Sequence, residues 1–208
     1  LSEEGGGICN ADGTVILTDT TVDGNSAVPA GGGGLWNRGV MTLYNSTVSR
    51  NIGQDGGGIL NVDGGLTLVN STISGNHCET GGGGGIASNG VLEIRSSTIA
   101  GNGCGRPGGG IENSGTATLF NSIIAGQEAG NDCNGGGITS LGYNLDSDGS
   151  CGLSEASDLP STPAWLVWAS SPGTSLDAAE AVGADIFIAC RATRLTAANR
   201  PPTASVEF

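Results

Sequence analysis

The chain has 208 residues, of which 40 are glycine, while aromatic residues make up 4% and charged residues 13%. This composition disfavours an ordinary compact helical or α/β domain, in which glycine is about 7% of residues. Seven arginines, no lysine and 20 acidic residues give a formal charge of -13, so nucleic acid and anionic membrane surfaces are repelled. No apolar run reaches the roughly 18 to 20 residues of a membrane span, and the sequence predicts none.

Three landmarks recur along the chain at an interval of about 25 residues, the kind of period that solenoid proteins show. The apolar residue that closes each glycine run is Ile8, Leu35, Ile59, Ile86 and Ile111, at spacings of 27, 24, 27 and 25. A polar residue before each Ser/Thr pair is Asp19, Asn45, Asn70, Ser96 and Asn121. A further asparagine follows at positions 25, 51, 76 and 102.

Each unit begins with a glycine run and a polar turn, continues as a short alternating strand, and ends in a second short strand. The alternating part of the units points one set of aliphatic side chains inward, namely Val15, Leu17, Met41, Leu43, Leu66, Leu68, Leu92, Ile94, Ala117 and Leu119. The second short strand adds Val22, Val48, Ile73, Ile99 and Ile124. One unit of three short strands cannot bury these residues alone, but units stacked about 4.8 Å apart share one core.

The sequence therefore predicts an all-β fold, a right-handed parallel β-helix of about five to six coils over residues 1–153. Asparagines at the bends are expected to stack into an internal ladder. Residues 154–208 break the repeat, and we interpret them as an irregular tail in which Trp165 and Trp168 cover the open end of the rod. A complete coil begins within five residues of the start, so we expect the chain to be part of a longer solenoid.

The unit with the most regular spelling runs through Gly56, Gly57, Gly58 and Ile59 to the segment from Asn70 to Asn76, NSTISGN. It resembles the repeats of bacterial secreted right-handed parallel β-helix proteins and of polymorphic outer-membrane proteins. That resemblance implies a secreted, cell-surface or outer-membrane protein that acts in adhesion or display. We assign no catalytic residues from the sequence.

Cysteines are expected to form disulfides. Cys78 and Cys104 each lie two residues after a ladder asparagine, so they share one position on adjacent coils and are close enough to pair. The segment between Cys133 and Cys151 resembles the final coil of the secreted β-helix proteins, which implies a clasp between these two cysteines. The sequence does not fix the pairing of Cys9 and Cys190.

A calcium loop is one hypothesis for the same closing segment. Asn144, Asp146, Asp148, Gly149 and Glu155 occupy positions 1, 3, 5, 6 and 12 of that pattern, which directs oxygen atoms at a hard cation. A tight turn that carries the disulfide explains the same residues without an ion.

Three further functions are alternatives to a structural or adhesive module. A carbohydrate-active β-helix, lyase or hydrolase, needs two close carboxyl groups, for which Asp55 and Glu79 are candidates. A glycan or a partner protein could bind outward aromatic residues, for which Tyr44, Phe120 and Trp36 are candidates. An ice-binding face could use the column Thr21, Thr47, Thr72 and Thr98. We expect an extracellular or cell-surface module whose partner is a surface glycan or a protein.

Overall fold

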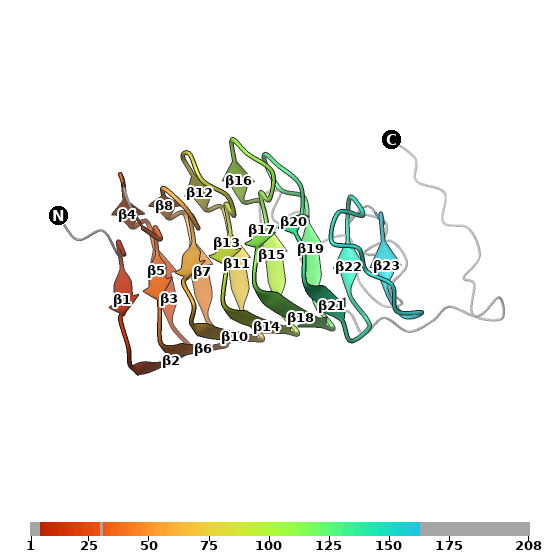
Figure 1. Cartoon of the computed structure of the whole chain (residues 1–208), viewed down its shortest axis with the longest axis horizontal. Coiled ribbons are helices and arrows are strands. Elements are labelled where there is room, and N and C mark those ends of the chain that lie inside the picture. Colours follow the sequence, from red (N-terminus) through yellow and green to blue (C-terminus); the bar gives the residue numbers. More distant parts are fainter. Residues whose placement is uncertain (1–4, 30, 163–208) are drawn as a thin grey trace, which may run out of the picture.

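The computed structural model describes residues 5–29 and 31–162, which form 23 β-strands and no helix. All strand pairings are parallel, and the strands of successive coils lie side by side from β1 at one end to β23 at the other (Figure 1). The architecture is a β-solenoid of about six turns, so the predicted fold class is confirmed. Among the described residues, no helix is long and apolar enough to cross a membrane.

Two six-stranded sheets contain the first strands of each coil. The first sheet contains β1 (Ile8–Asn10), β5 (Leu35–Asn37), β9 (Ile59–Asn61), β13 (Ile86–Ser88), β17 (Ile111–Asn113) and β20 (Cys133–Gly135). The second sheet contains β2 (Thr14–Thr18), β6 (Val40–Tyr44), β10 (Gly65–Val69), β14 (Val91–Arg95), β18 (Thr116–Phe120) and β21 (Ile138–Ser140).

The third sheet has seven strands and the fourth has four. The third contains β3 (Thr21–Asp23), β7 (Thr47–Ser49), β11 (Thr72–Ser74), β15 (Thr98–Ala100), β19 (Ile123–Ala125), β22 (Leu145–Asp146) and β23 (Leu159–Pro160). The fourth contains β4 (Ser26–Ala27), β8 (Ile52–Gly53), β12 (His77–Cys78) and β16 (Gly103–Cys104). This fourth sheet was not predicted, because its two-residue strands carry no periodic apolar pattern.

The core is a set of vertical aliphatic columns. Ile59 pairs with Ile86, and Ile86 pairs with Ile111, in the register of the first sheet, and all three side chains are fully buried. The second and third sheets contribute further columns of buried residues, as predicted: Met41, Leu43, Leu66, Leu68, Leu92, Ile94, Ala117 and Leu119, then Val22, Val48, Ile73, Ile99 and Ile124. In the first coil, Ile8, Val15 and Leu17 are only partly buried.

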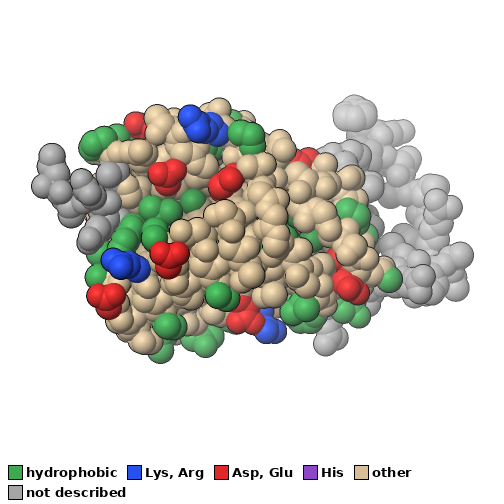
Figure 2. Space-filling view, viewed as in Figure 1, with side chains coloured by type: hydrophobic (Ala, Val, Ile, Leu, Met, Phe, Trp, Pro, Cys, Tyr) green, Lys and Arg blue, Asp and Glu red, His purple; other side chains and the backbone are tan. Residues whose placement is uncertain are grey.

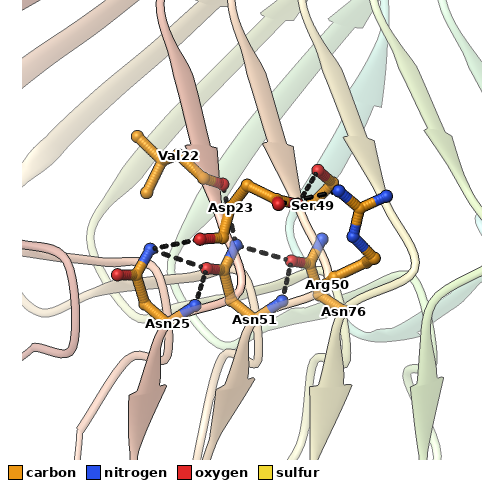
Figure 3. Close-up of polar contacts among 7 residues, drawn as sticks. All are labelled: Val22, Asp23, Asn25, Ser49, Arg50, Asn51 and Asn76. Carbon is orange, nitrogen blue, oxygen red and sulfur yellow. Dashed lines mark hydrogen bonds and ion pairs between the residues drawn. The ribbon is translucent and has the colours of Figure 1, made fainter.

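An internal asparagine ladder connects the coils at the corner between the third and fourth sheets. Asn51 donates hydrogen bonds from its backbone N and its Nδ2 to Oδ1 of Asn76, both at 3.0 Å. Asn76 donates to Asn102 in the same way, and Figure 3 shows the amides of Asn25, Asn51 and Asn76 side by side. The predicted ladder is confirmed, and it satisfies backbone groups that the bend leaves without sheet partners.

Two more ladders occupy the other corners. Between the first and second sheets, Asn10 donates to Asn37 and Asn37 donates to Asn61, at 2.8 and 2.7 Å. Between the second and third sheets, the backbone N–H of each ladder serine donates to the side-chain hydroxyl of the serine in the next coil. The donors and acceptors run from Ser46 to Ser71, from Ser71 to Ser97 and from Ser97 to Ser122. The residue before each of these serines, and before Thr20 in the first coil, has a left-handed backbone, with φ between 48 and 50°: Asp19, Asn45, Asn70, Ser96 and Asn121.

The glycine runs allow neighbouring coils to approach closely. A Cβ at Gly33 would lie 2.2 Å from the carbonyl oxygen of Gly57 in the next coil, so only glycine fits there.

Stacking continues beyond residue 153, because β23 pairs with β22 and matches Leu159 to Leu145. The repeat therefore extends further than the sequence indicated. The predicted capping residues Trp165 and Trp168, and Cys190, lie outside the described residues.

Candidate functional site

The coil that contains β20, β21 and β22, which we call the closing coil, holds a cluster of carboxylates beside the core. In the third sheet Asp146 stands in register with Ile124, so a carboxylate ends a column of buried aliphatic residues. Its side chain is fully buried. Its Oδ1 accepts hydrogen bonds from the backbone N of Asp148 and of Gly149, and its Oδ2 accepts one from Cys151 N at 2.8 Å.

Two further carboxylates lie beside Asp146. Single side-chain oxygens of Asp132, Asp146 and Asp148 all lie within 4.8 Å of one another. Asp132 is buried and accepts hydrogen bonds from Gln127 Nε2 and from the backbone N and hydroxyl of Ser147. Asp148 is exposed and accepts a bond from Asp132 N at 3.0 Å. We refer to these three residues as the closing-coil acids.

The closing-coil acids differ in protonation. Burial raises the pKa of Asp146 to about 6, against the opposing hydrogen bond from Cys151 N. Burial also raises the pKa of Asp132, although hydrogen bonds from Ser147 and Gln127 act the other way. For Asp148, burial disfavours the charged form, but hydrogen bonds that include Ser150 and Asp132 N outweigh it and lower the pKa. The cluster thus has one carboxyl with a lowered pKa and two carboxyls that retain protons more tightly than usual.

The structure brings only part of the predicted calcium loop together. Asp146 and Asp148 converge, but Asn144 serves the serine ladder: its Oδ1 accepts from Ser122 N at 2.9 Å, and its Nδ2 donates to Leu119 O and to Ser140. Glu155 is exposed, and its backbone N donates to Asp158. Calcium normally takes six to eight oxygen ligands, and the three carboxylates here already accept hydrogen bonds from the protein. The arrangement therefore fits a hydrogen-bonded cap of the core.

Asp132 was absent from the sequence-based set, although a signal for it existed. It precedes Cys133, which forms a disulfide with Cys151, with a Cα–Cα distance of 4.8 Å. Because that bond brings the two segments together, the residue before Cys133 had to lie near the Asp146–Asp148 turn. The other predicted disulfide, Cys78–Cys104, is also present, between register neighbours of β12 and β16.

The outer face of the second sheet, which we call the β2–β21 face, is a candidate contact surface in the described chain. It exposes Ile16 by 63%, Val91 by 61% and Val40 by 53%. Its ion pair joins Glu93 to Arg95 on the same strand, so these charges largely cancel. In the view of Figure 2, charged side chains are few on a mostly uncharged surface, and in places an acidic and a basic side chain lie next to each other.

Of the three aromatic side chains expected to point outward, Trp36 differs from the prediction because it is buried. Tyr44 is exposed, and Phe120 packs edge-on against Tyr143, with ring centroids 6.2 Å apart. Tyr143 was not predicted. Trp36, which we expected to point outward from the first sheet, is buried at 8% exposure. The backbone of Gly5 lies close to it, because a Cβ at Gly5 would lie 3.0 Å from Trp36 Cβ, and its burial removes the side chain from any recognition surface.

The threonine column on the third sheet is in register, from Thr21 through Thr47 and Thr72 to Thr98, and Ile123 ends it. Beside it, Asp23 accepts hydrogen bonds from Ser49 and Arg50, both at 2.7 Å (Figure 3). These bonds lower the pKa of Asp23. A charged pair therefore stands next to the hydroxyl column, which is not a uniform array.

The two carboxylates proposed for glycoside chemistry lie on the loops before the glycine runs. Asp55 is half-buried against the next coil, where its Oδ1 lies 1.4 Å from the position that a Cβ of Gly81 would take. Glu79 is exposed, and its backbone N donates to Gly53 O. The backbone of Gly81 thus lies directly beside Asp55.

Comparisons of the chain with family models, characterised proteins and solved structures found no match.

Proposed function

We propose that this chain is a non-enzymatic structural or adhesive module that acts in the extracellular space or at a cell surface. Two disulfides support an oxidising location, because such bonds persist mainly outside the cytoplasm. Parallel sheets with three internal ladders make a rigid rod, which suits display of a surface. The proposal concerns the β2–β21 face in particular.

One observation carries this proposal: three aliphatic side chains on a single flat sheet face are each more than half exposed, namely Ile16, Val40 and Val91. Exposed apolar residues that gather on one face of a folded chain can mark an interaction site, and here Val40 and Val91 stand in one column on either side of Gly65. Elsewhere in the described chain the exposed aliphatic side chains Val28, Ile52, Leu141 and Leu159 are each less than half exposed.

The charge of the chain restricts the kinds of partner that suit the β2–β21 face. The chain carries a formal charge of -13, which disfavours acidic polymers at long range. On the face itself Glu93 and Arg95 pair with each other. The partner that suits this surface is uncharged, either a neutral glycan or an apolar protein surface.

The experiment is binding of the purified chain to an array of neutral and acidic glycans and to candidate surface proteins, with a paired turnover assay on the same polysaccharides. Val40→Thr with Val91→Thr keeps the β-branched shape and removes the apolar contact. The matched control is Ile123→Thr on the third sheet, where threonine already fills the column. We expect binding that the paired variant weakens at least about tenfold and the control does not, a loss typical of contact residues. Binding that is unaffected by the paired variant contradicts the assignment of the face.

A glycan-binding role is a second candidate, supported by the aromatic side chains Tyr44, Phe120 and Tyr143 on or beside the face. Tyrosine and phenylalanine rings stack on the apolar faces of sugars. Loss of glycan binding in Tyr44→Ala, with retained protein binding, favours this role. Release of new reducing ends or unsaturated products would instead favour a carbohydrate-active enzyme.

A further inference from the structure

Three asparagines in the described chain are followed by glycine, in the pairs Asn89–Gly90, Asn102–Gly103 and Asn134–Gly135. The fold places these pairs in different environments. In such a pair the backbone nitrogen of the glycine can attack the side-chain amide carbon, because no Cβ obstructs the approach. The reaction needs a reachable amide, a glycine N–H that is not committed elsewhere, and a carbonyl that is polarised.

Two of the pairs are protected. Asn102 is fully buried, its Oδ1 and Nδ2 are used by the internal ladder, and Gly103 N donates to Asn76 O at 2.9 Å. Asn134 is half-buried and donates from Nδ2 to Glu112 Oε2 at 2.7 Å. A carboxylate acceptor on Nδ2 pushes electron density toward the amide carbon, which makes that carbon a poorer electrophile.

Asn89 has the opposite environment. It is exposed in the turn between β13 and β14, and its Oδ1 accepts a 2.7 Å hydrogen bond from the backbone N of Asp63 in the neighbouring coil. This N–H withdraws electron density from the carbonyl and is placed to stabilise the oxyanion that forms on attack. Within the described chain, Gly90 N donates no hydrogen bond.

Packing between coils also requires glycine at position 90. A Cβ at Gly90 would lie 2.2 Å from the carbonyl oxygen of Gly64, so the stacking of coils requires the residue that makes the attack possible.

We propose that Asn89 is a spontaneous deamidation site of the folded protein, activated by the N–H of Asp63. Gly90 N loses its proton to solvent and forms a bond to Cγ of Asn89. The Cγ–Nδ2 bond then breaks, and ammonia leaves after taking up a proton. Water adds across one of the two imide C–N bonds and yields aspartate or isoaspartate. The net reaction consumes one water and releases one ammonia.

The test follows all three pairs in one sample. The folded chain is incubated at mildly alkaline pH in ¹⁸O-labelled water, digested, and analysed for label and isoaspartate at each pair by mass spectrometry. A parallel sample is unfolded in urea with its disulfides reduced. In the folded chain we expect Asn89 to convert at least about tenfold faster than Asn102 and Asn134, which must first open locally. In the unfolded chain the three rates should become similar.

Asn89→Ser places at this turn the residue that Ser114 supplies in the next coil, and it should abolish the leading conversion while the fold is retained. Equal rates at the three pairs in the folded chain would overturn the proposal. So would a folded-state rate at Asn89 well below its rate in urea, because the N–H of Asp63 would then provide no activation.

Discussion

Ser88 stands directly beside Asn113 in the first-sheet register, and Asn113 Oδ1 is a buried oxygen with no hydrogen-bond partner among the described residues. The remaining positions of this ladder from Asn10 to Asn113 are asparagine, whose Nδ2 reaches the next coil. Serine is too short to do so: its hydroxyl accepts from Asn61 Nδ2 at 3.0 Å, and nothing is donated onward. The ladder is therefore interrupted at one rung.

Ser88→Asn is expected to complete that ladder and stabilise the fold by about 1 kcal/mol, the usual net value of a hydrogen bond that satisfies a buried group. In a thermal melt this corresponds to a rise of about 2 to 4 °C. Ser114→Asn makes the same chemical change in an exposed turn and should leave the melting temperature within a degree or so. A lower melting temperature for Ser88→Asn would contradict the ladder geometry.

The internal asparagine ladder should contribute far more to the free energy of unfolding than the exposed left-handed column that contains Asn70. Asn76→Ser removes an acceptor used by Asn51 and a donor used by Val48 O and Asn102, so it should cost about 3 kcal/mol or more. Asn70→Ser makes the same change in the exposed left-handed column, where Ser96 is already tolerated, and should cost less than about 1 kcal/mol. Urea unfolding measures both, and equal costs would show that burial of the ladder is not the source of its stability.

The closing-coil acids give stability an unusual pH dependence. Asp146 has a pKa raised from 3.8 to about 6, so the folded chain holds this proton more tightly than the unfolded chain. The resulting stability is fully present below about pH 4 and is lost as pH rises through about 6. Asp132, whose pKa is also raised, acts in the same direction.

We therefore expect the melting temperature to fall between about pH 4 and about pH 7, and Asp146→Asn to flatten that slope. The slope is the readout, because the variant also removes an acceptor for Cys151 N. A slope of the same size in Asp146→Asn would assign the effect to other groups.

The Cys78–Cys104 disulfide closes a loop with a sequence separation of 26 residues. Replacing both cysteines by alanine should lower the free energy of unfolding by about 3 kcal/mol, through the added freedom of the unfolded chain. Comparison of urea midpoints with and without reductant provides the check: reductant should shift the midpoint of the native chain more than that of the variant. An equal response would mean that this bond adds nothing.

Much of the fold was readable from the sequence because each coil repeats the same local rules. Ile59, Ile86 and Ile111 keep one phase relative to their neighbours, so the inward columns, the ladder asparagines and the Cys78–Cys104 pair could be placed before the structure was known. The features that were missed depend on contacts between segments. Trp36 is buried although it stands at the outward position of its strand, which no alternation of polar and apolar residues reveals.

The candidate site was less predictable for the same reason. The closing coil departs from the 25-residue period, so Asn144 could be matched to a loop pattern although its side chain continues the serine ladder. Asp132 reaches the other acids only because the disulfide of Cys133 and Cys151 joins the two segments.

The columns, ladders and disulfides all depend on the strand register between successive coils. Cross-linking of paired cysteines tests this register most directly. Thr72 and Thr98 are register neighbours on the third sheet, and the native disulfide shows that such neighbours, 4.8 Å apart between Cα atoms, can be bridged. Thr72→Cys with Thr98→Cys should form a disulfide under mild oxidation, as mapped by mass spectrometry. Thr72→Cys with Ala100→Cys should not, since an offset of two residues separates the Cα atoms by roughly 8 Å. Efficient cross-linking of the offset pair, or none of the register pair, would contradict the stacked-coil account.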